Sequence, residues 1–359
     1  MENITEFDDD SDEEIIKQTE NQFTSITSYT VGNSVRTIID MIEQNLIYLK
    51  PEFQREFIWD IRRSSKLIDS ILEGLPIPNI LLVKYKKDEK FIVVDGQQRL
   101  KTIYFFIKNE FNDNGTIKPF SLKGIENKKW SDKSFRELDE IMQRKIYNTI
   151  INSTILDNVE NSPGVIFEIF NRLNTGGVPL QAQEVRNCIY SGKVNEQLKE
   201  LNLYPSWRKL LKADKPNKRL QDIELILRFY SLFENKYESY KAPMRDWLNA
   251  SMQNSLIKGL SEHFIAQFKI ITDLALKQIG ETAFKGKSHN LNRSIFDAIM
   301  VGVSNCLKNN NLAEDISEKH KSLLVDAEFQ DCLIEGTTDH RKVKKRIDLA
   351  IKFYCNKND

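Results

Sequence analysis

The sequence predicts an α+β protein in which a mixed α/β domain precedes a mostly α-helical bundle domain. Two features of the chain predict this class. Between Thr24 and Phe120, short apolar runs typical of strands alternate with segments of helical period, whereas after Asn161 long segments of helical period dominate. The length of 359 residues also exceeds the usual size of a single hydrophobic core, which favours two domains.

Local signals predict the elements in order along the chain. In the first half they are a strand at residues 24–31, a helix at 35–46, a strand-like run at 46–50, a helix at 67–72, and strands at 79–85 and 90–94. Asn33 or Ser34 is the expected cap of the first helix, and Gly74 is expected to end the second. In the second half, a helix is expected to begin near Gln181, and further helices are predicted at residues 220–233, 256–276 and 341–354.

The expected domain boundaries follow this change in pattern. Residues 1–22 are rich in Asp and Glu and lack the apolar core of a signal peptide, so we expect an acidic flexible tail. Residues 23–130 are the expected α/β domain. Residues 131–359 are the expected helical domain, beginning with the segment at 171–177.

The overall composition excludes a strong global attraction to nucleic acid or membranes, because 52 basic residues balance 52 acidic ones. Any contact with DNA therefore has to be local. No apolar run approaches the roughly 18 to 20 residues that a membrane span needs. We therefore expect a cytoplasmic protein without a membrane partner.

The cysteines predict reduced thiols rather than disulfides or a zinc site. They lie far apart and form no Cys-x-x-Cys pair, at Cys188, Cys306, Cys332 and Cys355. Their simplest interpretation is as small buried hydrophobic residues.

The stretch from Phe91 to Ile107 carries the most specific local pattern. Its continuous apolar run at residues 91–94 predicts a strand buried on both faces, as in a parallel or mixed sheet. Asp95 and Gly96 end that strand, and from Leu100 the apolar residues recur at helical spacing. The predicted order of strand, tight turn and helix presents unpaired backbone N–H groups at the turn, where an anion such as a phosphate is favoured.

The polar residues of this turn suit a phosphate ligand. Gly96 allows close approach of the backbone, and Arg99 has the planar fork that matches phosphate oxygens. Asp95 is expected either to cap the helix or to hold a hard cation that bridges phosphates. Gln97 and Gln98 are uncharged donors at positions where alanine or glutamate would serve a helix equally well. A purely structural turn is the alternative interpretation.

Two further motifs accompany this turn. The first is Phe-Gln-Arg, which contains Gln54 and Arg55. The second, at residues 171–177, follows an apolar helical face and ends it with paired glycines, so that Arg172 and Asn174 lie at the exit of a helix. These two side chains are candidates to close over an anion, whereas a plain connection between two helices is the alternative.

Together the three motifs resemble the GmrS-like N-terminal domains of the GmrSD restriction endonucleases, a family related in fold to ParB and sulfiredoxin. The resemblance runs from about residue 26 to residue 190, and the remaining helices resemble stand-alone members more loosely. It implies a prokaryotic anti-phage role, in which a nucleoside triphosphate is hydrolysed with Mg²⁺ at the Asp-Gly-Gln-Gln-Arg site and modified DNA is recognised.

The expected site combines residues of all three motifs. Its catalytic residues are Asp95, Gln97, Gln98 and Arg99, with Asp95 also as the metal ligand. Its nucleotide-binding or phosphate-binding residues are Gln54, Arg55, Gly96, Thr102, Arg172 and Asn174. The motif of ParB itself has different residues, so the resemblance does not identify the base of the nucleotide.

The chain departs from many relatives, which carry a C-terminal HNH nuclease domain. Such a site needs histidine as metal ligand and general base. Here the histidines are widely scattered, at His263, His289, His320 and His340. We therefore expect the nuclease to be absent or carried by a separate effector protein.

Three classes of function are consistent with the sequence. The leading one is a metal-assisted nucleoside triphosphatase that senses infection in a restriction system. In it, Arg55 and Arg99 hold phosphates while Gln97 or Gln98 orients the attacking water. The alternatives are a DNA-binding module without turnover and a ParB-like DNA nuclease.

Basic runs are candidate DNA contacts, although such runs are usually solvated faces. They lie at residues 62–66, 208–219 and 341–346. In the last run, Arg346 is expected to lie off the buried face that Val343 and Ile347 mark. Tyr204 and Trp207, beside the second run, are candidates to stack on an extruded base, with core packing as the commoner role for such residues.

Overall fold

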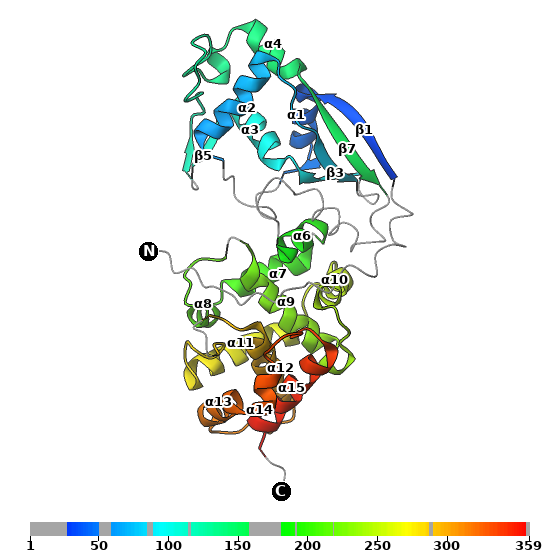
Figure 1. Ribbon diagram of the computed structural model, residues 1–359, viewed down its shortest axis with the longest axis vertical. Coiled ribbons are helices and arrows are strands. Elements are labelled where there is room, and N and C mark those ends of the chain that lie inside the picture. Colours follow the sequence, from blue (N-terminus) through cyan, green and yellow to red (C-terminus); the bar gives the residue numbers. More distant parts are fainter. Residues whose placement is uncertain are drawn as a thin grey trace. The chain divides into compact units, whose positions relative to one another are not determined.

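The computed structural model describes residues 27–49, 59–84, 89–113, 116–157, 181–190, 192–217, 219–286 and 290–356. Within these ranges the chain forms two compact units, an α/β unit up to residue 157 and a helical unit from residue 181. In Figure 1 the first unit runs from blue to green and the second from green to red. The predicted α+β class is therefore confirmed.

A mixed five-stranded sheet forms the frame of the α/β unit. Its strands are β1 (Thr27–Ser34), β2 (Ile47–Tyr48), β3 (Ile80–Lys84), β4 (Phe91–Asp95) and β7 (Ile150–Asp157). Their order in space is β1-β7-β3-β4-β2, with antiparallel pairs β1–β7 and β3–β4 and parallel pairs β7–β3 and β4–β2. The mixed sheet predicted from residues 91–94 is present, since β4 has one antiparallel and one parallel neighbour.

Helices and a small hairpin complete the described part of this unit. They are α1 (Val35–Glu43), α2 (Ile61–Glu73), α3 (Gln97–Lys108), α4 (Glu140–Asn148), the 3-10 turn η2 (Phe135–Glu137), and the hairpin of β5 (Phe111–Asp113) and β6 (Thr116–Lys118). Figure 1 shows α2 and α3 together on one side of the sheet. Ile38, Ile68, Phe106 and Ile155 belong to an apolar core that joins these helices to the sheet.

Local capping explains where the first two helices begin and end. At the start of α1, Ser34 accepts a hydrogen bond from the Thr37 N–H at 3.2 Å, as predicted. Asp60 caps α2 by accepting from the Arg63 N–H at 2.7 Å. Gly74 follows α2 in the left-handed region, with φ of 84°, so its predicted role as a helix end is also confirmed.

The α/β unit continues beyond the boundary that we expected at residue 130. β7 lies between β1 and β3 and pairs with both strands. α4 packs against α1 and α2. Sequence patterns place the boundary too early because β7 joins the sheet only through partners that are distant along the chain.

The described helices of this unit are 5 to 17 residues long, apart from the 3-10 turn η3, which has 3 residues. They are α6 (Ala182–Ile189), α7 (Lys193–Asn202), α8 (Pro205–Leu210), α9 (Gln221–Glu234), η3 (Tyr237–Ser239), α10 (Met244–Ser255), α11 (Glu262–Gln278), α12 (Arg293–Lys308), α13 (Ile316–Val325), α14 (Ala327–Asp331) and α15 (His340–Tyr354). The helices predicted at 220–233 and 341–354 are confirmed as α9 and α15. α11 begins later than predicted, because Gly259 in the left-handed region and the cap Ser261 separate it from α10.

The most apolar helices of this unit are core elements. α12 has 16 residues, most of them buried, and packs against α9, α11 and α15. Across the described ranges, no helix combines the length and the apolar character that crossing a membrane requires.

A shared carboxylate joins three helices of this unit. Asp297 of α12 accepts hydrogen bonds at 2.6 Å from both Arg228 of α9 and Arg346 of α15. The expectation that Arg346 lies off the buried face is wrong, because it is buried together with Val343 and Ile347. Helical period alone misplaces this arginine, since its partner lies 49 residues away in the sequence.

Cys306 and Cys355 form a disulfide that connects the last turns of α12 to the end of α15, with their Cα atoms 5.2 Å apart. The prediction of reduced thiols is therefore wrong for this pair. Sequence spacing gave no signal, because 49 residues separate the two cysteines and only the packing of α15 on α12 brings them together. Cys332 is a free, buried thiol, as predicted. The side chain of Cys188 lies outside the described part of the chain.

Candidate functional site

The junction between β4 and α3 has the predicted order of strand, turn and helix. Asp95 ends β4, Gly96 is the N-cap, and Gln97 is the first residue of α3. Gly96 has φ of 93°, in the left-handed region that residues with side chains rarely adopt. A Cβ atom here would come within 2.4 Å of the Ile80 side chain. The packing of the junction therefore requires glycine, independently of any ligand.

Asp95 does not cap α3, which overturns one of its two expected roles. Among the described residues, no side chain is seen to cap this helix start, whereas Asp60 and Asp139 cap α2 and α4. Asp95 Oδ2 instead accepts a hydrogen bond from Arg99 Nη2 at 2.5 Å. Asp95 therefore leaves the positive end of the α3 dipole uncapped, and such a helix end favours an anion.

Arg99 is the best-anchored residue of the candidate site. Besides Asp95, its Nη2 donates to the backbone oxygen of Asn79 at 3.1 Å, so this side chain ties the start of β3 to the end of β4. The Arg99 side chain is 15% exposed and that of Asp95 is 55% exposed. Arg99 Nε is buried and has no hydrogen-bond partner among the described residues. The guanidinium group is thus fixed in position with donor capacity left over.

The other predicted residues of this motif line the first two turns of α3. Gln97 is buried, and Gln98 is partly exposed. Thr102 is fully buried, and its Oγ1 has no hydrogen-bond partner in the described ranges. The structure therefore brings the predicted residues from Asp95 to Thr102 to one end of one helix.

Lys101 belongs to the same turns and was missed by sequence reasoning. It follows Gln97 by one helical turn and lies roughly opposite the core residues Ile103 and Phe106, yet only 4% of it is exposed. Burial lowers the pKa of its amine from 10.5 to about 8. A lysine on the polar side of an amphipathic helix normally predicts exposure, so the sequence offered no signal for this residue.

The other two motifs fall mostly outside the part of the chain that the structure describes. Gln54 and Arg55 of the first motif, and Arg172 and Asn174 of the second, are among those residues. Their expected roles therefore stay predictions. The helix expected near Gln181 is confirmed, since this residue is the N-cap of α6.

Part of the chain matches a known protein family. Residues 35–191 match the family described as GmrSD restriction endonuclease, N-terminal domain. The match begins with α1, extends through α6 and includes the whole junction of β4 and α3. This part of the chain belongs to the GmrSD N-terminal family. That assignment points to a role in restriction-type defence. No curated protein and no solved structure matches the chain.

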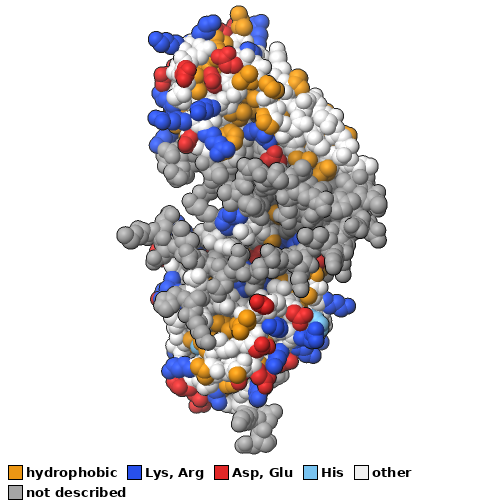
Figure 2. All heavy atoms as spheres, viewed as in Figure 1, with side chains coloured by type: hydrophobic (Ala, Val, Ile, Leu, Met, Phe, Trp, Pro, Cys, Tyr) orange, Lys and Arg blue, Asp and Glu red, His pale blue; other side chains and the backbone are white. Residues whose placement is uncertain are grey.

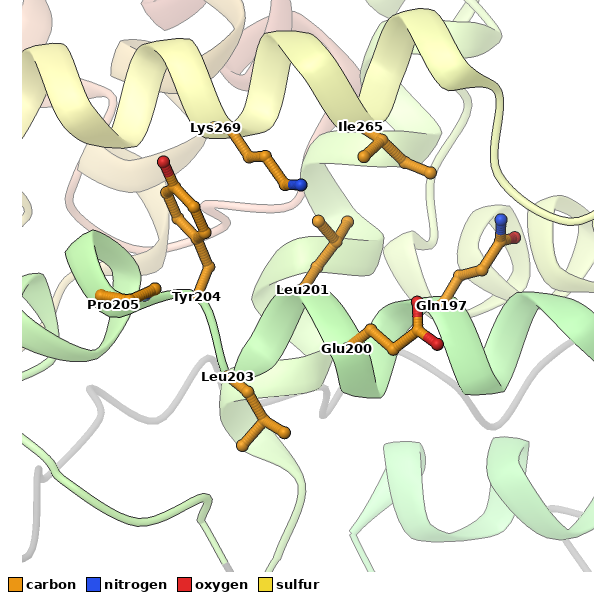
Figure 3. Close-up of a pocket in the computed structure, with 8 residues that line it drawn as sticks. All are labelled: Gln197, Glu200, Leu201, Leu203, Tyr204, Pro205, Ile265 and Lys269. Carbon is orange, nitrogen blue, oxygen red and sulfur yellow. The ribbon is translucent and has the colours of Figure 1, made fainter.

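Beyond the GmrSD N-terminal region, the two aromatic residues proposed to stack on a base have different surroundings. Trp207 is fully buried and packs edge-on against Phe268, so it is a core residue. Tyr204 lines a cavity of about 250 Å³ between α7 and α11, with Lys269 across from it (Figure 3). Its hydroxyl donates to Asp273 at 2.8 Å, and this hydrogen bond raises the pKa of Tyr204.

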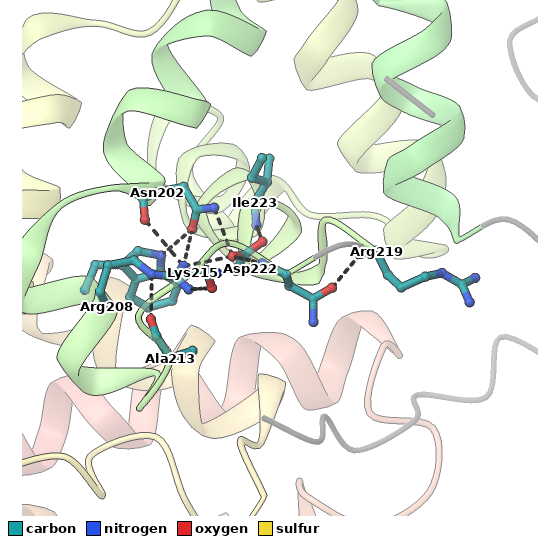
Figure 4. Close-up of polar contacts among 9 residues, drawn as sticks. Asn202, Arg208, Ala213, Lys215, Arg219, Asp222 and Ile223 are labelled. Carbon is teal, nitrogen blue, oxygen red and sulfur yellow. Dashed lines mark hydrogen bonds and ion pairs between the residues drawn. The ribbon is translucent and has the colours of Figure 1, made fainter. Parts of the chain in front are cut away.

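Part of the basic run at residues 208–219 is engaged in hydrogen bonds within the protein. Arg208 donates to Asp222 at 2.8 Å and also to the backbone oxygens of Ala213 and Lys215 (Figure 4). The run therefore folds around its own first arginine, which is 9% exposed. This residue is not available to a DNA backbone.

The two other basic runs also make contacts within the protein. In the first, the guanidinium of Arg63 lies 4.7 Å from the ring centre of Trp59. In the last, Lys345 pairs with Glu328 at 2.9 Å, and Lys342 donates to backbone oxygens at the end of α14 and just beyond it. On the face shown in Figure 2, basic and acidic side chains are interspersed in both units. DNA contact through these runs stays a prediction.

Proposed function

We propose that this protein is a nucleoside triphosphatase that serves as the sensing component of a restriction-type anti-phage system. The observation that carries the proposal is the Asp95–Arg99 pair at the N-terminal end of α3, behind the left-handed turn at Gly96. A helix N-terminus favours anions, and a fixed guanidinium beside it suits a phosphate group. The family membership of residues 35–191 supports the restriction setting.

In this function Arg99 binds phosphate with the donors that the fold leaves unused. Its two hydrogen bonds within the protein both come from Nη2, while Nε is unpaired in the described ranges. Guanidinium carries five N–H groups, so a bidentate contact to phosphate oxygens is compatible with the anchoring by Asp95 and Asn79. Because the side chain is held before the ligand arrives, less conformational entropy is lost on binding.

Asp95 is suited to a Mg²⁺ ion that arrives with the nucleotide. Its carboxylate is half exposed, and only Oδ2 is engaged by Arg99. Mg²⁺ commonly binds one or two carboxylates together with substrate phosphates and water, so a single Asp fits this mode. Such an ion, when bound, neutralises charge on the phosphates. Among the described residues, no group of three or more His, Cys, Asp or Glu side chains forms a further candidate metal site.

Gln98 is the better placed of the two glutamines to orient the attacking water, because it is partly exposed whereas Gln97 is buried. Glutamine has this role in other nucleotide hydrolases. The reaction transfers the terminal phosphoryl group to water, which yields orthophosphate and a nucleoside diphosphate. Gln97, which is buried, then has a structural role at the first turn of α3.

A separate nuclease and DNA are the partners that this function requires. Of the four histidines, His263, His320 and His340 lie on α11, α13 and α15, and His289 is outside the described residues. In our proposal phage or modified DNA triggers nucleotide hydrolysis, and a second protein cuts. The purified chain alone is then expected to leave plasmid DNA intact in Mg²⁺. Robust nicking by the chain alone would instead favour the ParB-like nuclease.

Phosphate release by variants of Arg99 tests the site. Arg99→Ala should reduce the rate on the order of 10³-fold, as for other arginines that stabilise phosphoryl transfer. Arg99→Lys should also be impaired, because lysine keeps the charge but lacks the planar fork. The rate is measured with and without DNA, and circular dichroism checks the fold.

Arg144→Ala is the matched control, since Arg144 forms an exposed i,i+4 ion pair with Glu140 at 2.7 Å on α4. It should hydrolyse nucleotide like the parent. Parental activity in a folded Arg99→Ala would contradict the site. A parent that binds triphosphate without releasing phosphate would leave the binding module as the function.

A further inference from the structure

Lys101 is a buried cation without a counter-charge. It is 4% exposed, and no described residue forms an ion pair or hydrogen bond with its ammonium group. Lysine is almost never fully buried unless it is paired, because removing its charge from water is costly. With a pKa of about 8, the amine still carries its proton in most molecules near neutral pH. Within the described ranges, this positive charge therefore has no partner.

A lysine at position 101 can extend its side chain toward the start of α3. Side chains of a helix lean toward its N-terminus. Lys101 follows Gln97 by four residues, an axial distance of about 6 Å, which an extended lysine side chain can span. Its ammonium group is thus within reach of the opening turn, where Gly96 and Arg99 lie.

Neighbouring polar atoms are also left without partners. Arg99 Nε and Thr102 Oγ1 are both buried and have no hydrogen-bond partner among the described residues. Buried polar atoms in proteins are nearly always hydrogen-bonded, so each such orphan calls for an explanation. Arg99 and Lys101 lie about 200° apart around the helix, so their cationic groups suit an extended anion with several acceptor oxygens that crosses the opening turn, rather than a single phosphate group.

We propose that Lys101 is a phosphate ligand that, together with Arg99, holds the polyphosphate of the nucleotide at the opening turn of α3. This inference rests on the nucleotide site proposed above and adds its second positive charge. Lysine serves as a point charge and Arg99 as a planar fork, so the two cations are not redundant. Thr102 contributes a hydroxyl on the next residue.

Inorganic pyrophosphate tests this role without any hydrolysis. Its affinity is measured by isothermal titration calorimetry for the parent and for Lys101→Met, which keeps most of the length of the side chain and removes the charge. Loss of one charge-assisted hydrogen bond predicts about 10-fold to 100-fold weaker binding. The control is Lys108→Met, on the same helix but paired with Glu43 and partly exposed, which should bind pyrophosphate like the parent.

Proton uptake gives a second readout that a merely structural lysine would not change. At a pH of about 8 the parent should take up protons when pyrophosphate binds, because the anion stabilises the charged amine, and Lys101→Met should take up fewer. Heats measured in buffers of different ionisation enthalpy report this number.

The outcomes separate this inference from the proposed function. The protein could bind pyrophosphate in a way that depends on Lys101 and yet release no phosphate from any triphosphate. That result supports Lys101 as a phosphate ligand and contradicts the proposed hydrolysis. Absence of pyrophosphate binding in the parent, or equal affinity and equal proton uptake in Lys101→Met, overturns the inference.

Discussion

At the scale of single residues, the start of α3 contains several groups that lower the stability of the folded protein. Lys101 is buried as a cation, and Arg99 and Thr102 keep buried polar atoms unpaired in the described ranges. Each of these features destabilises the folded protein without ligand. Natural proteins tolerate such costs mainly where function needs them.

Replacing Lys101 by methionine should change the free energy of unfolding in a way that depends on pH. The folded pKa of about 8 lies below the unfolded value of 10.5. Burial of the charged amine therefore lowers the free energy of unfolding fully below pH of about 8, and this loss disappears as pH rises toward 10.5. Without ligand, Lys101→Met should therefore be more stable than the parent near neutral pH, by up to about 3 kcal/mol. The difference should shrink in urea unfolding at higher pH. A less stable Lys101→Met would contradict the buried charge.

Gly96→Ala probes the close contact behind the turn. The added Cβ meets both the left-handed backbone and the Ile80 side chain at 2.4 Å. Gly280 has nearly the same φ, 92°, but nothing within 4 Å of a Cβ. Gly280→Ala should cost about 1 kcal/mol from backbone strain, and Gly96→Ala about 1–3 kcal/mol more from overpacking. Equal losses in chemical unfolding would show that the contact with Ile80 relaxes freely.

At the scale of elements, local signals and long-range contacts determine different things. Ser34 and Gly74 set helix ends through hydrogen bonds within a few residues, and the strand, turn and helix around Gly96 followed from one contiguous stretch. α13 and α15 instead depend on contacts across the sequence. His320 Nδ1 and the hydroxyl of Tyr354 form a buried hydrogen bond at 2.8 Å between these two helices.

Acid should loosen the contact of α13 with α15. Burial lowers the pKa of His320 to about 4, below the unfolded value of 6.5. Its stabilising contribution is therefore complete above pH 6.5 and is lost as pH falls toward about 4, with about 2 kcal/mol gone by a pH of about 5. His320→Gln should flatten this part of the profile in chemical unfolding, whereas the exposed His340→Gln should not. An unchanged profile in His320→Gln would refute the assignment.

At the scale of the whole molecule, the sequence predicted the class of fold and the strand, turn and helix that carry the candidate site, but not what distant residues do together. Asp95 and Arg99, which contact each other, belong to one contiguous motif. The Arg346–Asp297 pair, the Cys306–Cys355 disulfide and the place of β7 all join residues that are far apart in the sequence. The burial of Lys101 likewise arises only once the chain has folded.

Reduction of the disulfide should destabilise the helical unit. The bond closes a loop of 49 residues, which in the chain-entropy model is worth about 4 kcal/mol. A reductant should therefore lower the melting temperature of the parent but not that of a Cys306→Ala, Cys355→Ala variant. Peptide mapping without reduction should recover the linked pair. Both thiols free in the purified, unreduced protein would contradict the bond.

The strand order β1-β7-β3-β4-β2 has a consequence for biosynthesis. β7 sits between β1 and β3 but is the last of these strands to leave the ribosome. Until residue 157 has emerged, β1 lacks its neighbour and β3 exposes an open edge, which nascent chains can use for mispairing. A fragment truncated at residue 130 keeps both defects permanently, so it should be recovered in aggregates, whereas the α/β unit requires translation through β7.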